Sequence, residues 1–389
     1  MRRLFPDEAV SITLLRGMEG LESLRDAWSK ILSGMTRRHF FHLWEWHYSY
    51  LKCLETNPNS LIYFLFMKED SPIAIFPLQS TKTSLGGLRL KTLAFPSHNH
   101  IPLSDMICRR EALQLPLFQL LVRHLRDEGK SWDMIRLHHV LDDACAIQIT
   151  NNHPPPRFLI RQEGRCDFID AAETYEVFLS GLSKNFRRSL KRAKQYLGEL
   201  PGVQFAFTQN GPELEERFLA FMDVEASGWK GTSGSGTAIK LHPNLKCFYE
   251  TLIRTLCPSG NISVNTLSTD KKCIAAHFCI LLDDTAYVLK IGYDEGYKRY
   301  APGNLLIQFF IKKSIEGCSI KTINLITDAK WHEDWNTRSY NRSILYLFNA
   351  TPAGLSGFII QKSFLILKTH YQAYIKPHLS QATKPLFRH

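Results

Sequence analysis

The stretch VLKIGYDEGYKRYAPGNLLIQFFIKK, residues 288–313, decides the fold of this chain. An apolar run ends in a polar loop, and a second apolar segment begins at Pro302 and Gly303, which predicts a strand, a turn and a helix. The first turn of a helix presents free N–H groups and a positive dipole end, and glycine allows a ligand close to the backbone. With Lys298 and Arg299 just ahead, this helix start is a candidate pyrophosphate site. The alternative is simple geometry, because Pro-Gly begins many helices that bind nothing.

The chain around this stretch alternates helical and strand patterns. Residues 261–294 hold three apolar runs separated by short polar turns, which predicts three antiparallel strands. Apolar residues at helical spacing predict helices at 174–200, 213–229, 245–256 and 301–318. The expected fold class is therefore α/β (α+β), a mixed and mostly antiparallel sheet flanked by helices.

The first half repeats the same kind of pattern. Residues 60–81 read as a hairpin with a charged turn, and they resemble the strand–turn–strand of 261–280. Two copies of one αβ unit explain this likeness, although any two hairpins share some of it. Three consecutive prolines near residue 155 are typical of a linker. We therefore expect three parts, with bounds 1–165, 166–350 and a basic amphipathic tail at 351–389.

The composition of the chain indicates which partners and which cellular location to expect. The 389 residues carry a formal net charge of +11, which favours nucleic acid, anionic lipid or phosphate-bearing ligands, or reflects only a basic surface. Nine scattered cysteines without a CxxC pair predict reduced thiols and no metal site. The start of the chain lacks an apolar signal region, and residues 357–367 are too few to span a bilayer. We expect a cytoplasmic protein, with peripheral contact to the inner membrane face as an option.

Several motifs together resemble the GNAT acyltransferases related to the CelD cellulose-biosynthesis protein. The family's K-x-x-Y-D-E-x-Y-x-x-x-S-P-G-x-L-L matches residues 290–306, with Ala301 in place of the serine. Its E-x-x-x-W-K-G followed by G-T-A-I matches residues 225–239, with a short insertion. The segments FFHLWEW, AIFPL and NHIPLSD of the first half are also similar to the family, as is the basic helix NFRRSLKRAKQYL. The resemblance covers roughly residues 20–345.

The resemblance implies tandem GNAT-like domains, with an acyl-CoA in a V-shaped split between two strands of the second domain. It assigns the donor to Lys290, Arg299, Gly303, Asn304 and Leu305. The usual GNAT loop has glycine where this chain has Pro302, and proline supplies no N–H to a phosphate. An acyl carrier protein therefore stays open as the donor.

The implied reaction is attack of an amine on a thioester, which requires proton transfers. Candidate catalytic residues are Asp328, Asp294, Glu225, His277 and Tyr293, with Tyr300 as another proton donor. Structural roles compete with these assignments, since His277 also suits a core position, Asp328 a helix cap and Asp294 a turn.

The acceptor side is less defined. Trp229, Lys230 and Trp335 are candidate substrate-binding residues, and packing in a core is the alternative for the two tryptophans. The basic helix presents Arg187, Arg188, Lys191, Arg192 and Lys194 on one face and Phe186, Leu190, Ala193 and Leu197 on the other. Its basic face is either solvated or contacts phosphates, an acidic carrier protein or a membrane.

Three functions follow from this sequence. The first is an N-acyltransferase acting on an amine in polysaccharide, lipid or cell-envelope biosynthesis. The second is a FemAB-like transferase that uses aminoacyl-tRNA, the only setting in which we expect nucleic acid. The third is a non-catalytic member that binds an acylated partner.

Overall fold

The computed structural model describes residues 3–5 and 10–371. Its described strands form one continuous 14-stranded sheet, with β6 (Ile107–Cys108) joined only to β4. The first half contributes β1 (Arg3–Phe5), β2 (Val10–Arg16), β3 (Leu61–Lys68), β4 (Ser71–Leu85), β5 (Leu88–Ala94) and β7 (Met134–Leu141). The second half contributes β9 (Gln204–Thr208), β10 (Ile262–Ser268), β11 (Cys273–Leu282), β12 (Thr285–Tyr293) and β13 (Thr322–Asn324).

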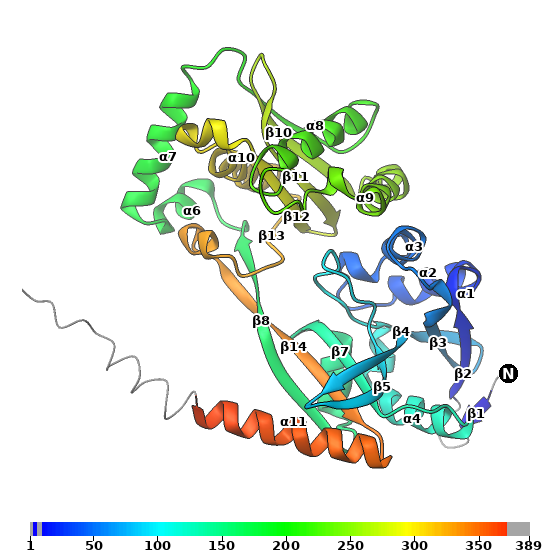
Figure 1. The fold of residues 1–389 in the computed structure, drawn as a ribbon. Coiled ribbons are helices and arrows are strands. Elements are labelled where there is room, and N and C mark those ends of the chain that lie inside the picture. Colours follow the sequence, from blue (N-terminus) through cyan, green and yellow to red (C-terminus); the bar gives the residue numbers. More distant parts are fainter. Residues whose placement is uncertain (1–2, 6–9, 372–389) are drawn as a thin grey trace, which may run out of the picture.

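Two long strands join the halves. β8 (Phe158–Asp170) and β14 (Arg338–Phe348) pair antiparallel and run from one half to the other (Figure 1). β14 also pairs with β7, so a strand from late in the sequence completes the sheet of the first half. The proposed boundary at residue 165 falls within β8, and the division into domains stays a prediction.

The two halves share one strand order. In each, antiparallel neighbours end at a strand that pairs in parallel: β2-β3-β4-β5 with β7, and β9-β10-β11-β12 with β13. This shared order fits the sequence echo between the two hairpins. The predicted α/β fold, with a mixed and largely antiparallel sheet flanked by helices, is confirmed. The two units, however, share a continuous sheet.

Helices cover both faces of the second half's sheet. Alternate residues of β11 face opposite ways: Phe278 contacts the layer of α8 (Glu213–Ser227) and α9 (Pro243–Leu256), whereas Cys279 contacts the layer of α7 (Lys184–Leu197) and α10 (Pro302–Gly317). The predicted helix at 174–200 is two helices, α6 (Tyr175–Gly181) and α7, because Ser183 caps α7 by accepting the N–H of Phe186. The amphipathic prediction for α7 is confirmed: Phe186, Leu190, Ala193 and Leu197 are buried and its basic residues are exposed.

The first half carries the remaining helices. These are α1 (Gly17–Ser23), α2 (Arg25–Ser33), α3 (Trp44–Cys53), α4 (Leu117–Asp127) and α5 (Cys145–Asn152). The apolar layer around α3 continues into α8 and α9 of the second half, so one core spans the two halves. A disulfide between Cys53 of α3 and Cys247 of α9 crosses the same contact. The expectation of reduced thiols is therefore wrong for this pair, which the chain brings together from positions 194 residues apart.

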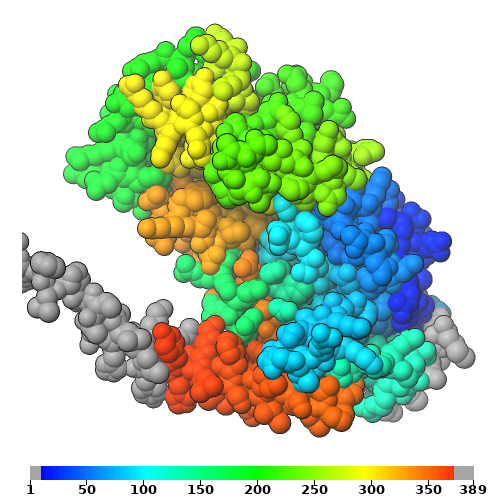
Figure 2. All heavy atoms as spheres, in the orientation of Figure 1, coloured from blue at the N-terminus to red at the C-terminus, as the bar shows by residue number. Residues whose placement is uncertain are grey.

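The last described helix, α11 (Pro352–His370), lies along the base of the molecule (Figures 1 and 2). Its first turns pack closely, because Gly357 lies against Leu90 and Phe348. From Lys362 onward nearly every residue of the helix is exposed. Within the described residues, no helix is long and apolar enough to cross a membrane. The end of the predicted tail lies outside the described residues.

Candidate functional site

The second half's sheet opens between β12 and β13. The two strands pair in parallel over three positions only, from Thr285 with Thr322 to Tyr287 with Asn324. Beyond Tyr287, β12 continues to Tyr293 without a partner on this side, because β13 ends at Asn324. On its other side β12 pairs with β11, and the register skips Leu289 between the pairs Phe278–Lys290 and Cys279–Val288. This bulge and the missing neighbour leave backbone groups of β12 available to a ligand.

A cavity of about 410 Å³ occupies the α10 side of this split. Two parts of the chain form most of its wall: the end of β12 and the start of α10. The lining residues are His277, Ile291, Gly292, Tyr293, Lys298, Ala301, Pro302, Gly303, Asn304, Ile307 and Trp331. The strand–turn–helix that the sequence predicted is therefore the frame of a cavity large enough for part of a small molecule.

The start of α10 faces this cavity. Ala301 precedes the helix with a positive φ of 43°, and its carbonyl accepts the N–H of Leu305 at 3.1 Å. The N–H groups of Gly303 and Asn304 lie in the first turn and have no partner within the helix, while Pro302 has no N–H to offer. Two backbone donors, the helix dipole and Lys298 together suit an anionic group.

His277 contributes an unpaired nitrogen to the cavity. Its side chain is 3% exposed, and Nδ1 makes no hydrogen bond with any residue that the structure describes. Burial lowers the pKa of His277 to about 3, so the ring is neutral near pH 7. A buried polar atom without a partner costs free energy unless a ligand or water satisfies it. This environment differs from that of a core histidine whose ring is fully hydrogen-bonded.

Tyr293 lies at the mouth of the cavity, at the end of β12. It is 37% exposed, and a Cβ added at Gly303 would lie 3.8 Å from its ring. Its hydroxyl can therefore reach a ligand that lies between the strand end and the helix start.

Glu225 and Lys230 form a support behind the strand end. Glu225 is buried on α8, where one oxygen lies 3.1 Å from Lys230 Nζ and the other accepts the N–H of Ile239 at 2.9 Å. Lys230 Nζ also donates to the carbonyl of Ile291 at 3.1 Å. Gly292 leaves no room for a side chain, because an added Cβ would lie 2.7 Å from the Cα of Glu225. These contacts fix the backbone of the cavity wall, and neither charged side chain lines the cavity.

The two aspartates lie away from the cavity. Asp294 accepts the N–H of Gly296 at 2.9 Å and forms an ion pair with Lys272, so it holds the turn after β12. Asp328 is exposed and accepts the N–H of Arg165 on β8 at 3.4 Å. It does not cap the short helix that follows, whose N-cap is Ala329.

Four other predicted residues also lie outside the lining. Arg299 stacks over the ring of Tyr196 on α7 at 4.6 Å. Leu305 is in the core, and Trp335 is fully buried against Phe186 with ring centroids 4.9 Å apart. Trp229 is 62% exposed, and its backbone N–H donates to the Glu295 carboxylate. The structure therefore brings together His277, Tyr293, Lys298, Gly303 and Asn304 at the cavity, and it places the other predicted site residues, Tyr300 included, outside the lining.

Lys290 occupies the opposite face of β12. It lies directly across from Phe278, whose ring is 5.0 Å from that of Tyr249 on α9. The hydroxyl of Tyr249 lies 2.8 Å from Nδ1 of His100, which comes from the first half. Lys290 is therefore part of a junction between the halves and not of the cavity.

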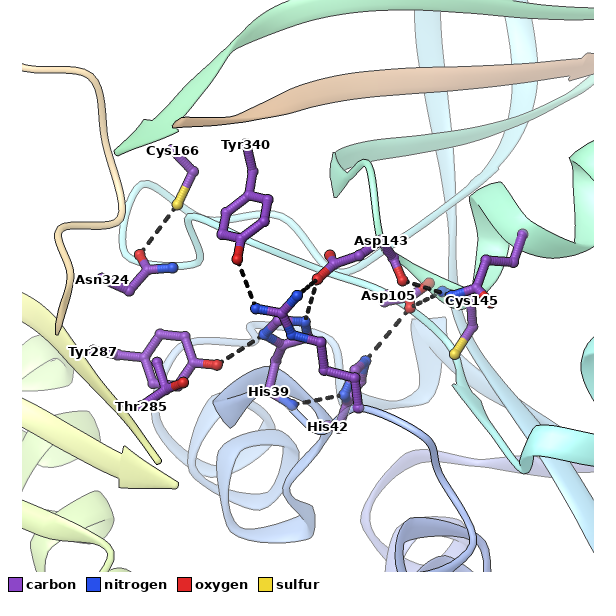
Figure 3. Close-up of polar contacts among 12 residues, drawn as sticks. His39, His42, Asp105, Asp143, Cys145, Cys166, Thr285, Tyr287, Asn324 and Tyr340 are labelled. Atoms are coloured by element: carbon purple, nitrogen blue, oxygen red, sulfur yellow. Dashed lines mark hydrogen bonds and ion pairs between the residues drawn. The ribbon is translucent and has the colours of Figure 1, made fainter. Parts of the chain in front are cut away.

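A second junction is rich in polar contacts (Figure 3). His39 Nδ1 lies 2.8 Å from the hydroxyl of Tyr287, and its Nε2 lies 3.5 Å from Asp143. Arg37 pairs with Asp143 at 2.5 Å and donates to Tyr340 at 2.8 Å. These contacts connect the first half to β12 through Tyr287 and to β14 through Tyr340.

Sequence reasoning missed part of the lining. Trp331 and Ile307 line the cavity, but the residues around them in the sequence carry no motif that sets them apart from an ordinary loop or helix. Of the pair next to Lys290, His98 directly precedes the quoted segment NHIPLSD and His100 lies within it, and a His-x-His in a loop was the available signal. Within the described part of the chain, no cluster of three or more His, Cys, Asp or Glu could hold a metal ion.

Comparisons with known proteins agree with this geometry. Residues 184–335 match the model of an acetyltransferase (GNAT) domain. FemX has a similar fold, with a TM-score of 0.52 and 8% identity over 82% of this chain and 95% of FemX. L-PGS from Bacillus licheniformis gives a TM-score of 0.51 and 9% identity over 87% of this chain and 96% of that one. No curated protein matches the sequence. Residues 184–335 are thus similar to a GNAT acetyltransferase domain, and the fold of the whole chain is similar to that of FemX.

Proposed function

We propose that this protein is an N-acyltransferase that moves an acyl group from acyl-CoA to an amine. The observation that carries the proposal is the cavity between the unpaired end of β12 and the start of α10. A thioester donor needs a slot for its pantetheine arm and a site for its phosphates. The free edge of β12 beyond Tyr287 suits the arm, because an extended chain can hydrogen-bond to an unpaired strand.

The donor's pyrophosphate fits the start of α10. The N–H groups of Gly303 and Asn304 are available there, and Lys298 adds a positive charge. Pro302 removes one donor, so the site holds phosphate with fewer backbone contacts than a glycine-rich loop would. The exposed basic face of α7 lies beside α10 and offers further charge to a phosphate or to an acidic carrier protein.

The reaction needs no group beyond donor, acceptor and this cavity. The neutral amine attacks the thioester carbonyl carbon, a C–N bond forms, and the C–S bond breaks. The hydroxyl of Tyr293 gives its proton to the leaving thiolate and regains one from the new nitrogen. His277 is neutral and unpaired on Nδ1, so it can accept a hydrogen bond from the amine and orient it. The products are an amide and the free thiol.

A second candidate is transfer from aminoacyl-tRNA. The fold likeness to FemX and the net charge of +11 favour it. The chemistry differs, because an ester oxygen would then be the leaving group in place of a thiolate. A tRNA also needs a wide basic surface, and the exposed face of α7 supplies Arg187, Arg188, Lys191, Arg192 and Lys194.

We also propose that the protein works on an anionic membrane surface, in a cell-envelope pathway. In α11 the side chains of Leu355, Ile359 and Ile366 follow one face of the helix and are exposed, Ile359 to 63%. An apolar helix normally buries such a face, so an exposed one marks a contact surface. The sequence from residue 335 to 389 has seven Lys or Arg and no Asp or Glu. That charge favours anionic lipid over a second, equally basic copy of the chain.

One assay separates the two donors. Labelled acetyl-CoA, a longer acyl-CoA and an aminoacyl-tRNA are each incubated with the protein and hydroxylamine, a small amine nucleophile. Formation of the hydroxamate from an acyl-CoA alone, at a rate above that of the same mixture without protein, supports the proposal. Formation only from aminoacyl-tRNA supports the second candidate, and binding of an acyl-CoA without product would indicate a non-catalytic member.

A further inference from the structure

The face of β12 that points away from the cavity carries a small cluster of basic side chains. Lys290 stands there opposite Phe278, under α9. His100 reaches the same place from the first half and contacts Tyr249, and the ring of His98 is 5.6 Å from that of His100. Both halves of the chain therefore contribute to the cluster, whereas the donor cavity on the other face is lined by residues of the second half.

The charges of this cluster do not balance. Glu225 is the carboxylate beside it, and both of its oxygens are already used by Lys230 and by the N–H of Ile239. Lys290 Nζ makes no hydrogen bond or ion pair with any residue in the described ranges 3–5 and 10–371. One positive charge at the junction thus lacks a partner.

The pKa values of Lys290 and of the two histidines beside it are all lowered. Burial lowers the pKa of Lys290 to about 8, and the charge of Lys230 acts in the same direction. Burial also lowers the pKa of His98, and that of His100 to about 3, with Lys290 adding to both shifts. Near pH 7 the two imidazoles are therefore neutral and can donate or accept hydrogen bonds without adding charge. A half-buried ammonium is stabilised strongly by an anion that arrives with a ligand.

We infer that Lys290, with His98 and His100, binds a singly charged anionic group of the acceptor, a carboxylate or a phosphodiester. The inference rests on the proposed function and specifies its acceptor. A donor on the α10 face leaves the thioester approachable from the α8 and α9 face, which is where the cluster lies. Lys290 belongs to the same unpaired stretch of β12, so an anion held there places a nearby amine at the split. One unpaired charge matches a monoanion better than a phosphate dianion.

The test uses acetate and dimethyl phosphate as probes of the two anion classes, measured by titration calorimetry on the whole protein. We expect saturable binding of one of them, and the one that binds names the class. Lys290→Gln should weaken that binding by roughly tenfold or more, and Lys290→Arg should retain it. The matched control is Lys30→Gln, which removes an exposed lysine of α2 and should leave anion binding unchanged.

Two outcomes would overturn the inference. One is that neither probe binds the wild-type protein. The other is that Lys290→Gln and Lys30→Gln weaken anion binding equally, which would indicate a general charge effect. Acetyl-CoA binding is measured in the same samples, because it should survive Lys290→Gln. If acetyl-CoA fails to bind even the wild type, the proposed donor is wrong. The anion titration remains a separate test of whether Lys290 binds an anion.

Discussion

His277 and Ile291 lie directly opposite each other on β11 and β12, and both side chains line the cavity. This pair places a neutral imidazole beside the only stretch of β12 that lacks a neighbour on the β13 side in the described chain. The histidine environment has a measurable consequence for stability. The pKa of His277 is about 3 in the folded protein and about 6.5 when unfolded, so the unfolded state binds more protons between these values.

Stability should therefore fall as the pH drops below about 6.5, by up to about 1.4 kcal/mol per pH unit for this one group. In His277→Gln, the loss of unfolding free energy between pH 7 and pH 5 should be smaller than in wild type by about 2 kcal/mol. Urea unfolding at several pH values measures this. Parallel pH profiles of variant and wild type would show that His277 titrates normally.

Tyr293→Phe should slow acyl transfer and leave donor binding intact. The variant loses only the hydroxyl that protonates the thiolate, so kcat with acetyl-CoA and hydroxylamine should fall by roughly 10²-fold. Tyr300→Phe is the matched control, since Tyr300 does not line the cavity. An unchanged kcat in Tyr293→Phe, or an equal loss in both variants, would remove Tyr293 from the reaction.

The disulfide between Cys53 and Cys247 fixes the number of free thiols. The sequence has nine cysteines, so the denatured, unreduced protein should react with seven equivalents of a thiol reagent. Reduction should lower the free energy of unfolding by about 2–5 kcal/mol, because the bond closes a long loop in the unfolded chain. Cys318→Ser, which removes an exposed free thiol, should have no comparable effect. Nine reactive thiols before reduction would contradict the bond.

α11 should bind vesicles that contain anionic lipid. In co-sedimentation, the protein should associate with phosphatidylglycerol-containing vesicles and much less with pure phosphatidylcholine, and added salt should weaken the association. Ile359→Asp should reduce it, whereas Leu219→Asp, on an exposed apolar position of α8, should not. Concentration-dependent dimerisation that Ile359→Asp abolishes, without vesicle binding, would assign this face to a second copy.

The local features of the fold could be predicted from the sequence because they depend on short-range patterns. The helix start at Pro302, the hairpins and the amphipathic α7 follow from spacing and turn residues alone. The insertion of β14 beside β7 could not be predicted, since it joins residues about two hundred positions apart and leaves no local signal.

The same distinction applies to the site. Among the site residues that line the cavity, Gly303, Asn304 and Tyr293 were predicted because they belong to one continuous motif, and His277 because it is a histidine in an apolar strand. Asp328 and Trp335 were predicted from the family resemblance and from the position of Asp328 at a strand end, but the direction of a side chain after a strand depends on tertiary packing. The neighbours of Lys290 come from a loop nearly two hundred residues away, so its place at a junction was beyond sequence reasoning.

The central claim is that the start of α10 holds the phosphates of an acyl-CoA. Calorimetric titration of acetyl-CoA into Asn304→Asp tests it most directly, because a carboxylate at this position repels phosphate without removing any backbone group. The control is Asn210→Asp on an exposed loop. We predict that Asn304→Asp weakens acetyl-CoA binding by roughly tenfold or more while Asn210→Asp binds like wild type. Equal affinity in all three proteins, or no binding by the wild type, would contradict the claim.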